Sequence, residues 1–259
     1  MRILMIGDVV GRPGRRAVKD NLAHIRDSFG ISFVLANAEN VAGGVGVTRE
    51  TAGELFSYGV DALTSGNHVW DKKESFDFIA EETRLIRPAN YPPGVPGIGY
   101  NVFQVGGCKI GVVNLCGRVF MPELDCPFRK AEEILSVLQE VTPIILVDFH
   151  AEATSEKAAF GWFLDGRATA IFGTHTHVQT ADERILPGGT AYITDVGMTG
   201  PRDGVIGFKS GPIVAKYLTQ LPKRFEVAAG PYQFDACVVT VDPATGKALD
   251  IQRIKNVEA

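Results

Sequence analysis

Short apolar runs in this chain repeatedly end in side chains that can bind a metal ion. The chain has five histidines, and four of them follow such runs, beside two carboxylates and two carboxamides. The candidates are Asp8, Glu39, Asn40, Asn67, His68, His150, His175 and His177. A bare cluster of carboxylates and imidazoles is costly to bury without a cation. The pattern therefore predicts a metal site.

The mix of ligand types indicates which metals and which chemistry to expect. Imidazoles with carboxylates suit Mn, Fe or Zn better than Ca or Mg. No cysteine stands among the candidates, which argues against a structural zinc site. So many ligands fit two ions roughly 3.5–4 Å apart, bridged by a carboxylate. Such a pair lowers the pKa of a bridging water and binds the oxygens of an in-line displacement at phosphorus, so we predict hydrolysis of phosphoester bonds.

The segment IFGTHTHVQT, residues 171–180, carries the most closely spaced pair of candidates. In an extended chain, side chains at positions i and i+2 point the same way. We therefore expect His175 and His177 to lie on one side at the end of a strand. The fifth histidine, His24, lies in NLAHIRD within an expected helix, where a surface or packing role is the ordinary one.

Apolar runs and amphipathic stretches alternate along the chain, which is typical of an α/β sheet with crossover connections. The runs are RILMIGD, FVLANAEN, ALTSGNH, IILVDFH and AIFGTHTH. Between them we expect helices over residues 14–28, 48–58, 127–140 and 154–165. Thr48 is the expected N-cap of the second helix, without a capping box because Thr51 stands where Glu is usual. Ligands bind outside the carboxyl ends of strands in open α/β sheets, so the strands would deliver the candidates to one edge.

Two regions depart from this alternation. Residues 100–115 are expected to form a hairpin that turns at Gly106 and Gly107. The C-terminal part holds further strands in TAYITDV, FDACVVTVD and ALDIQRIKNV, the last two around a turn at 243–246. The sheet is therefore mixed, or two sheets lie face to face. No repeat or linker divides the chain, so we expect a single domain over residues 1–259.

Composition restricts the partners and the compartment. Hydrophobic residues make up 45% of the chain and charged residues 22%, as in an ordinary soluble globular protein. A net charge of −4 gives no basic surplus for duplex DNA or an anionic membrane, although a small or single-stranded, RNA-derived nucleotide could still bind at a metal. The opening MRILMIGDVV is no secretory signal, no apolar run is long enough for a membrane span, and the four cysteines form no CxxC. We expect a reduced, cytoplasmic protein.

The order of the candidate motifs resembles the calcineurin-like metallophosphoesterase superfamily. The blocks read GDVVG, NAEN, SGNHVWD, DFHAE and GTHTHVQT, and they span residues 7–180. GDVVGRPGR, GNHVWDKKE and TDVGMTGP resemble its YmdB-like branch of bacterial phosphodiesterases over essentially the whole chain. The resemblance implies a four-layer α/β/β/α sandwich with two mixed sheets. It also implies hydrolysis of phosphodiesters, with 2′,3′-cyclic nucleotides as the favoured substrates, and a homo-oligomer.

The resemblance also assigns roles to the candidate residues. It implies that Glu39 bridges the two ions and that His68 protonates the leaving oxygen. Alternatively, His68 would contact only residues that themselves touch the phosphate. Asp8 and His177, with Asn40, would hold one ion, and Asn67, His150 and His175 would hold the other. Hydroxide bound to the metals would attack the phosphorus. Fe or Mn is the expected metal, with Zn as a third choice.

The chain departs from the superfamily pattern at three places. Val10 stands where the first block usually has a histidine, Glu39 replaces the usual bridging Asp, and Val69 replaces an acidic residue. Asn40 could replace the missing histidine. These changes leave the metal identity and occupancy open more than the reaction type.

Several other interpretations compete with this one. The glycine spacing in GDVVGRPG differs from a dinucleotide-binding turn. An amidohydrolase barrel usually carries His-x-His on its first strand, whereas here the motif comes late, at residues 175–177. A third alternative is a regulator that keeps the fold and binds a nucleotide without catalysis. The Gly-rich loops at 41–47 and 195–207 would form tight turns or wall the site, with Thr199 or Arg202 near the substrate.

Overall fold

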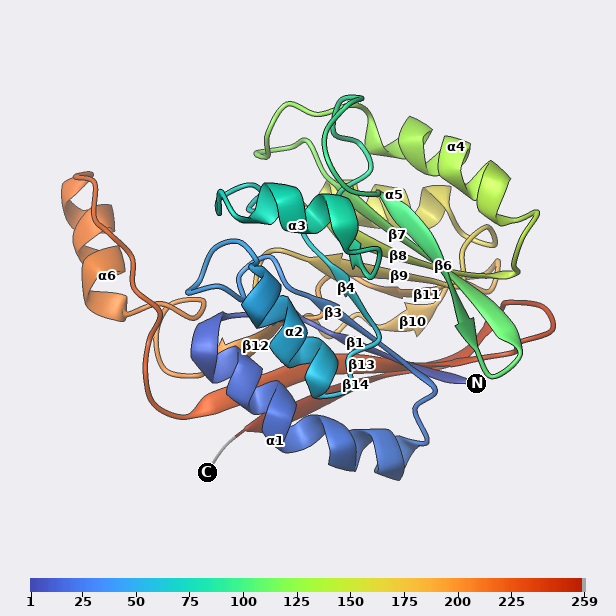
Figure 1. The fold of residues 1–259 in the computed structure, drawn as a ribbon, viewed down its shortest axis with the longest axis horizontal. Coiled ribbons are helices and arrows are strands. Elements are labelled where there is room, and N and C mark those ends of the chain that lie inside the picture. Colours follow the sequence, from blue (N-terminus) through green and yellow to red (C-terminus); the bar gives the residue numbers. More distant parts are fainter. Residues whose placement is uncertain (258–259) are drawn as a thin grey trace.

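Two mixed β-sheets pack face to face and carry helices on both outer faces (Figure 1). The computed structural model describes residues 1–257. The expectation of a four-layer α/β/β/α sandwich is confirmed. The arrangement has neither the closed barrel of an amidohydrolase nor the single open sheet of a dinucleotide-binding fold.

The first sheet has β1 at its centre and β2 at one edge. Its order is β2-β12-β13-β1-β3-β4-β5, and β14 pairs with β13. The strands are β1 (Arg2–Ile6), β2 (Asp8–Val9), β3 (Phe33–Asn37), β4 (Ala62–Thr64), β5 (Leu85–Ile86), β12 (Met198–Pro201), β13 (Tyr232–Val241) and β14 (Ala248–Val257). β1, β3, β4 and β5 run parallel, whereas β13 is antiparallel to β1, β12 and β14. The carboxyl ends of the parallel strands therefore meet at one edge.

The second sheet has the order β10-β11-β9-β8-β7-β6. Its strands are β6 (Tyr100–Val105), β7 (Cys108–Cys116), β8 (Ile144–His150), β9 (Ala170–Thr174), β10 (Arg184–Ile185) and β11 (Ala191–Ile193). β7, β8, β9 and β11 are parallel, and the edge strands β6 and β10 are antiparallel. The hairpin predicted around Gly106 and Gly107 is confirmed as the β6–β7 pair.

Alternating side chains divide the core into three layers. In β1, Ile3 and Met5 face the second sheet, while Leu4 and Ile6 face the helices. The same period of two recurs along β8, as expected for strands that are covered on both faces. Apolar packing therefore holds the two sheets together over much of their shared face, and near the strand ends Asn37 of the first sheet donates to Asp148 of the second.

The helices cover both outer faces. They are α1 (Gly11–Phe29), α2 (Arg49–Ser57), α3 (Ser75–Glu81), α4 (Pro127–Leu138), α5 (Thr154–Phe163) and α6 (Ser210–Thr219). α1, α2 and α3 pack on the first sheet, and α4 and α5 on the second. The four helices expected from the sequence are present, whereas α3 and α6 were not predicted. None of the helices described in residues 1–257 has the length and hydrophobicity needed to cross a membrane.

The absence of a capping box at α2 was a wrong prediction. The Thr48 hydroxyl accepts a hydrogen bond from the Thr51 backbone, and the Thr51 hydroxyl accepts one from the Thr48 backbone at 3.0 Å. A threonine hydroxyl can thus replace the usual Glu carboxylate as the returning acceptor.

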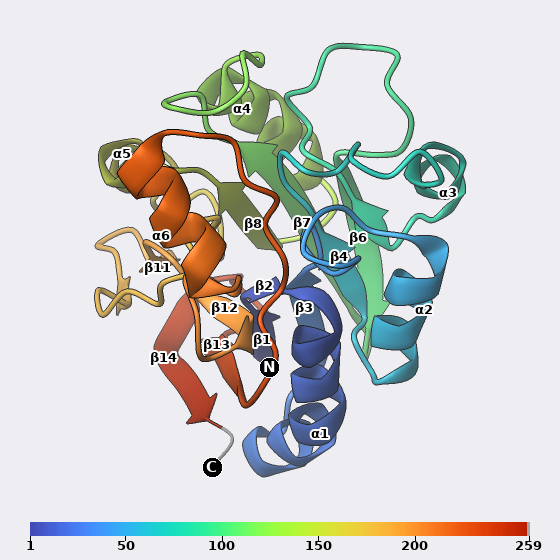
Figure 2. The same ribbon diagram turned by 90° about the vertical axis from the view of Figure 1, so that its left-hand side faces the viewer.

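The helix α6 stands away from the two sheets, on the side where α1 begins (Figures 1 and 2). Only Ile213 of this helix is buried, while Tyr217 and Leu218 on it are 76% and 80% exposed. The helix α6 therefore contributes little to the hydrophobic core.

Candidate metal centre

Strands of both sheets bring the candidate ligands to one place. Asp8 begins β2, Glu39 and Asn40 follow β3, and Asn67 and His68 follow β4 in the first sheet. In the second sheet, His150 ends β8, and His175 and His177 follow β9. Asp8, Glu39 and His150 are at most 1% exposed. The centre therefore lies where the carboxyl ends of the parallel strands of both sheets meet.

One group of donor atoms surrounds His150. Its Nε2 atom lies 3.1 Å from Glu39 Oε1, 3.1 Å from Asn67 Oδ1 and 3.0 Å from His175 Nδ1. Ligands that each lie about 2.0–2.2 Å from one ion at right angles are about 3 Å apart. Glu39, His150 and His175 also stand out as a set of metal-capable side chains whose donor atoms all lie within 4.8 Å of one another. This spacing fits a shared ion.

Hydrogen bonds outside this group determine which nitrogen of His150 carries the proton. The Thr174 hydroxyl donates to Asp148 Oδ1 at 2.7 Å and lies 2.9 Å from His150 Nδ1. Since the hydroxyl proton is already used, Thr174 accepts from Nδ1–H. In the neutral ring, the Nε2 lone pair of His150 would face the centre, which is the form that binds a metal.

The ring of His175 is oriented in the same way. Its Nε2 lies 3.2 Å from the Glu152 carboxylate, so the ring donates outward from Nε2 and turns Nδ1 toward His150. Burial and the neighbouring His150 lower the pKa of His175 to about 3, so the ring is neutral. His175 therefore also presents a lone pair to the centre.

A second group consists of Asp8, Asn40 and His177. Nδ1 of His177 donates to the Ile206 carbonyl at 2.9 Å, which leaves Nε2 facing Asn40 Oδ1 at 3.2 Å and Asp8 Oδ1 at 3.9 Å. Asn40 donates its amide to the Gly44 carbonyl, so its oxygen points inward. Asp8 Oδ1 is buried without a hydrogen-bond partner in the described structure. A buried, unsatisfied carboxylate oxygen beside an imidazole lone pair fits a cation.

The charges of the two groups point to the same conclusion. Burial raises the pKa of Asp8, because an ionised carboxylate loses its hydration there. Burial acts the same way on Glu39, but the His150 ring beside it lowers the pKa of Glu39 below its usual range when that ring is protonated. Burial opposes this protonation, but Glu39 and Asp8 outweigh it and raise the pKa of His150 to about 9, so a metal ion would displace the proton on His150 Nε2. Divalent cations would stabilise both carboxylates, and the set of oxygen and imidazole donors is one that Mn, Fe or Zn accepts.

The backbone at His175 and His177 was predicted wrongly. The segment is not extended, because β9 ends at Thr174 and φ is +101° at His175 and +64° at His177. The two rings consequently reach different groups of the centre rather than lying side by side. Non-glycine residues with positive φ are strained, and strain of this kind concentrates at functional sites.

A buried ion pair holds this strained segment. Lys157 Nζ donates to the Thr174 carbonyl and to Asp195 Oδ2, both at 2.7 Å. The same Asp195 oxygen accepts from the Thr176 backbone at 3.1 Å and from its hydroxyl at 2.8 Å. Lys157 and Asp195 are at most 1% exposed. They bind the segment on both sides of His175.

Gly66 allows the two sheets to approach each other at the centre. A Cβ atom there would lie 2.3 Å from Glu39 Oε2 and 2.4 Å from His150 Nε2. Any side chain at this position would displace the candidate ligands. The glycine of the SGNH block is thus needed for close packing.

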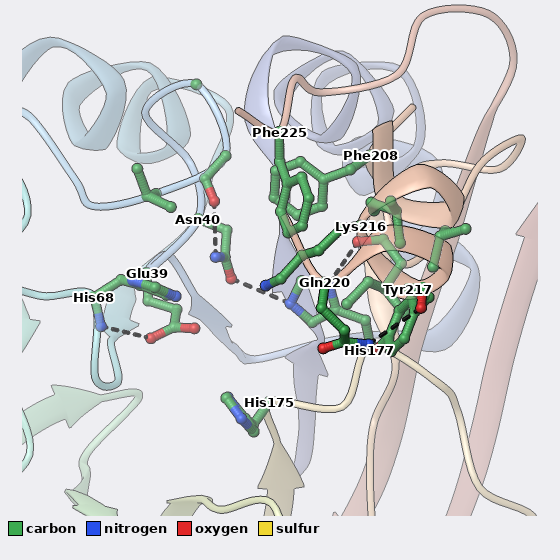
Figure 3. Close-up of a pocket in the computed structure, with 16 residues that line it drawn as sticks. Glu39, Asn40, His68, His175, His177, Phe208, Lys216, Tyr217, Gln220 and Phe225 are labelled. Carbon is green, nitrogen blue, oxygen red and sulfur yellow. Dashed lines mark hydrogen bonds between the residues drawn. The ribbon is translucent and has the colours of Figure 1, made fainter. Parts of the chain in front are cut away.

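The ring of His68 lies beside the ligands without joining them. Its backbone N–H donates to Glu39 Oε2 at 3.1 Å, and its Nδ1 lies 2.8 Å from Asp71 Oδ2. The side chain lines the cavity in front of the centre (Figure 3). The Asp71 carboxylate accepts from Nδ1 and orients the ring, which leaves Nε2 free for another partner.

The sequence did not indicate the residues that orient the ligands. Asp71 lies three residues from His68, which it contacts, so proximity in sequence was the available signal there. Glu152 is close in sequence to His150 but contacts His175, so no such signal existed for it. Both Gly-rich loops do wall the cavity, through Gly43 to Val45 and through Val205 and Ile206. Thr199 and Arg202 do not line it, contrary to expectation, because Thr199 is buried and donates to the Asp235 carbonyl.

An α/β/β/α sandwich with carboxylates, carboxamides and imidazoles at the strand ends of both sheets is the arrangement of the calcineurin-like metallophosphoesterases. Residues 4–254 match the family model described as YmdB-like protein, and the chain belongs to this family. The resemblance noted in the sequence is confirmed.

Individual relatives cover nearly the whole chain. A 2′,3′-cyclic-nucleotide 2′-phosphodiesterase of Bacillus subtilis (strain 168) is 52% identical over 254 residues, which are 98% of this chain and 96% of that protein. The crystal structure of a hypothetical protein from Thermus thermophilus has a TM-score of 0.94 at 44% identity and covers 100% of both chains. A novel phosphatase of Mycoplasma pneumoniae has a TM-score of 0.94 at 37% identity, covering 99% of this chain and 93% of its own.

Proposed function

We propose that the chain is a two-metal phosphodiesterase that hydrolyses nucleoside 2′,3′-cyclic phosphates. The observation that carries the proposal is the common orientation of three histidine rings. His150, His175 and His177 each use one ring nitrogen for an outer partner and turn the other toward buried carboxylates. The Bacillus subtilis relative, described as a 2′,3′-cyclic-nucleotide 2′-phosphodiesterase, supports the substrate class.

The broader statement is that the chain is a hydrolase that acts on phosphoester bonds. Relatives described as a phosphodiesterase and as a putative phosphatase/phosphodiesterase match 98% and 100% of the chain. The number and identity of the ions belong to the proposal, with Fe or Mn first and Zn next. The single domain, the cytoplasmic location and the homo-oligomer stay predictions.

The proposed centre divides the ligands between two ions. Glu39 would bridge them. Asp8, Asn40 and His177 would hold one ion, and Asn67, His150 and His175 the other. When bound, the ions would supply a water of lowered pKa and positive charge for the phosphate oxygens.

The chain's own residues would guide the reaction at the leaving oxygen. Water that has given one proton to solvent adds to the phosphorus, the bond between phosphorus and O2′ breaks, and His68 gives the Nε2 proton to O2′. Solvent then returns a proton to His68. The product is a nucleoside 3′-phosphate. Asp71 keeps the His68 ring in place during this transfer through its contact with Nδ1.

The substitution Glu39→Gln tests the proposal. Bound metal and turnover of 2′,3′-cyclic AMP would be measured after loading with Mn or Fe and after chelation. Glu133→Gln, on the exposed face of α4, is the matched control. We expect turnover that requires metal in the wild type and in the control. In Glu39→Gln we expect turnover to fall about 100-fold or more, with loss of bound metal.

Two results would contradict the proposal. If Glu39→Gln kept the turnover of the wild type, Glu39 would not bridge the two ions. Absence of turnover with every metal, together with less than one ion bound per chain, would overturn the dinuclear centre and favour the regulator.

A further inference from the structure

The candidate ligands occupy only one end of a larger cavity. Its volume is about 590 Å³. Glu39 and His68 lie on one side, α6 with the segments that flank it forms the other, and His177 lies next to α6 (Figure 3). A phosphate group fills a small part of this space, and the volume is typical of pockets for small organic ligands. A substrate whose phosphate lies at the ligands must place the rest of its body toward α6.

The far end of the cavity is aromatic and apolar. Phe208 and Phe225 lie there with ring centroids 6.2 Å apart and planes inclined by 50°. Val205, Ile206 and Ile213 complete this wall. Aromatic faces stack with all the nucleobases and discriminate little between them. The wall therefore suits the planar base of a nucleotide rather than a sugar or a second phosphate.

A cation borders the aromatic wall. Lys216 of α6 lines the cavity, and its Nζ lies 5.1 Å from the centroid of the Phe225 ring. Within the described part of the chain, no carboxylate forms an ion pair with Lys216. Its charge is thus available to attract an anionic nucleotide into the cavity.

The wall is also tied to the candidate ligands. The Ile206 carbonyl accepts the hydrogen bond from His177 Nδ1 at 2.9 Å. The loop that carries Phe208 therefore has a fixed position relative to the centre, although α6 itself packs little against the sheets. A base and a phosphate of one ligand can be held at a constant separation.

We infer that α6, the loop 205–208 before it and the segment after it that carries Phe225 form a nucleoside subsite, in which the base of the substrate stacks against Phe225 without selection among bases. This inference rests on the proposed function and names the part of the substrate that α6 recognises. It predicts that Phe225 favours cyclic phosphates that carry a base over those without one, and that Phe225 takes no part in the chemistry.

The test compares a substrate with a base and one without. The values of kcat/KM are measured for 2′,3′-cyclic AMP, 2′,3′-cyclic CMP and glycerol 1,2-cyclic phosphate in the wild type and in Phe225→Ala. Phe163→Ala is the matched control, because Phe163 is 37% exposed and Phe225 is 38% exposed, and Phe163 lies outside the cavity.

We expect Phe225→Ala to lower kcat/KM about tenfold for both nucleotides, the effect of losing one base–aromatic stack. The value for glycerol 1,2-cyclic phosphate is expected to stay within twofold, and Phe225→Trp to restore the nucleotide values. Equal effects on all three substrates, or none, would overturn the subsite and leave the proposed function intact. A change of oligomeric state in Phe225→Ala would also overturn it, since a second copy would then cover this wall.

A failure of the proposed function is distinguished by a binding measurement. If the wild type hydrolyses no cyclic phosphate, binding of 3′-AMP to the Mn-loaded protein is measured by calorimetry. Binding that weakens about tenfold in Phe225→Ala would support the subsite on its own. Equal affinity in both proteins would contradict it.

Discussion

The ring of His68 is positioned for proton transfer in the proposed reaction. Its Nδ1 is held by Asp71 at 2.8 Å, while the side chain lines the cavity. His68→Ala should lower kcat for 2′,3′-cyclic AMP by about 10²–10⁴-fold, because O2′ then leaves without a proton donor. On bis(p-nitrophenyl) phosphate, whose leaving group needs no proton, the loss should stay within about tenfold.

A comparison of the two substrates separates proton donation from phosphate binding by His68. An equal loss on both would mean that His68 binds the phosphate instead. Asp71→Asn keeps the size of the residue that holds Nδ1 but removes its charge, and a smaller loss with the same dependence on leaving group is expected. Bound metal should be unchanged in both variants, since neither residue is a candidate ligand.

At the scale of the elements, the segment after β9 depends on α5. Lys157→Met keeps the approximate length of the side chain but leaves Asp195 charged and buried without its partner. We expect about 3–5 kcal/mol less stability. The affinity for Mn should fall about 10–100-fold, because the hydrogen bonds to Thr174 and Thr176 keep His175 in place. Denaturant unfolding and a metal titration measure the two effects.

The control for this prediction is Lys130→Met on α4, where the pair with Glu133 is exposed. It should change stability by at most about 0.5 kcal/mol. If Lys157→Met lowered stability while metal affinity stayed at the wild-type value, the ion pair would support the fold but not the ligands.

The elements also show what the sequence could and could not predict. A local sequence pattern is enough to recognise a strand that ends in polar residues or a helix with an apolar stripe. β1, β3, β8 and α1 were therefore predictable. The contacts of Thr174 with Asp148 and His150 depend on how neighbouring strands align across the sheet. α6 buries only Ile213 and has no strong stripe to signal it. The turn at His175 has a positive φ, a conformation that sequence rules expect at glycine, so the histidine gave no sign of it.

Over the whole molecule, Asp235 should make stability depend on pH. It lies in β13 with Oδ1 unpaired in the described structure, and burial raises its pKa from 3.8 to about 6. The folded state therefore binds the proton more tightly than the unfolded chain. The resulting stabilisation is complete below about pH 4 and is lost as pH rises through 6.

Asp235→Asn tests this dependence. At pH 7.5 the variant should be about 3 kcal/mol more stable than the wild type, because it no longer buries a charge. The two proteins should converge near pH 4, as followed by urea unfolding across this range. A difference that is constant with pH would show that Asp235 does not titrate in this way.

The position of β1 in the first sheet has a consequence for the newly synthesised chain. β1 pairs with β13 through residues as distant as Met5 and Cys237, and β2, which begins at Asp8, pairs with β12. At 5–20 residues per second, a ribosome would need roughly 10–50 s to add the chain between Met5 and Cys237. During that interval one edge of β1 has no partner strand. Asp8 could reach its final place only when most of the chain has left the ribosome, so a metal ion could be incorporated only near the end of translation or after it.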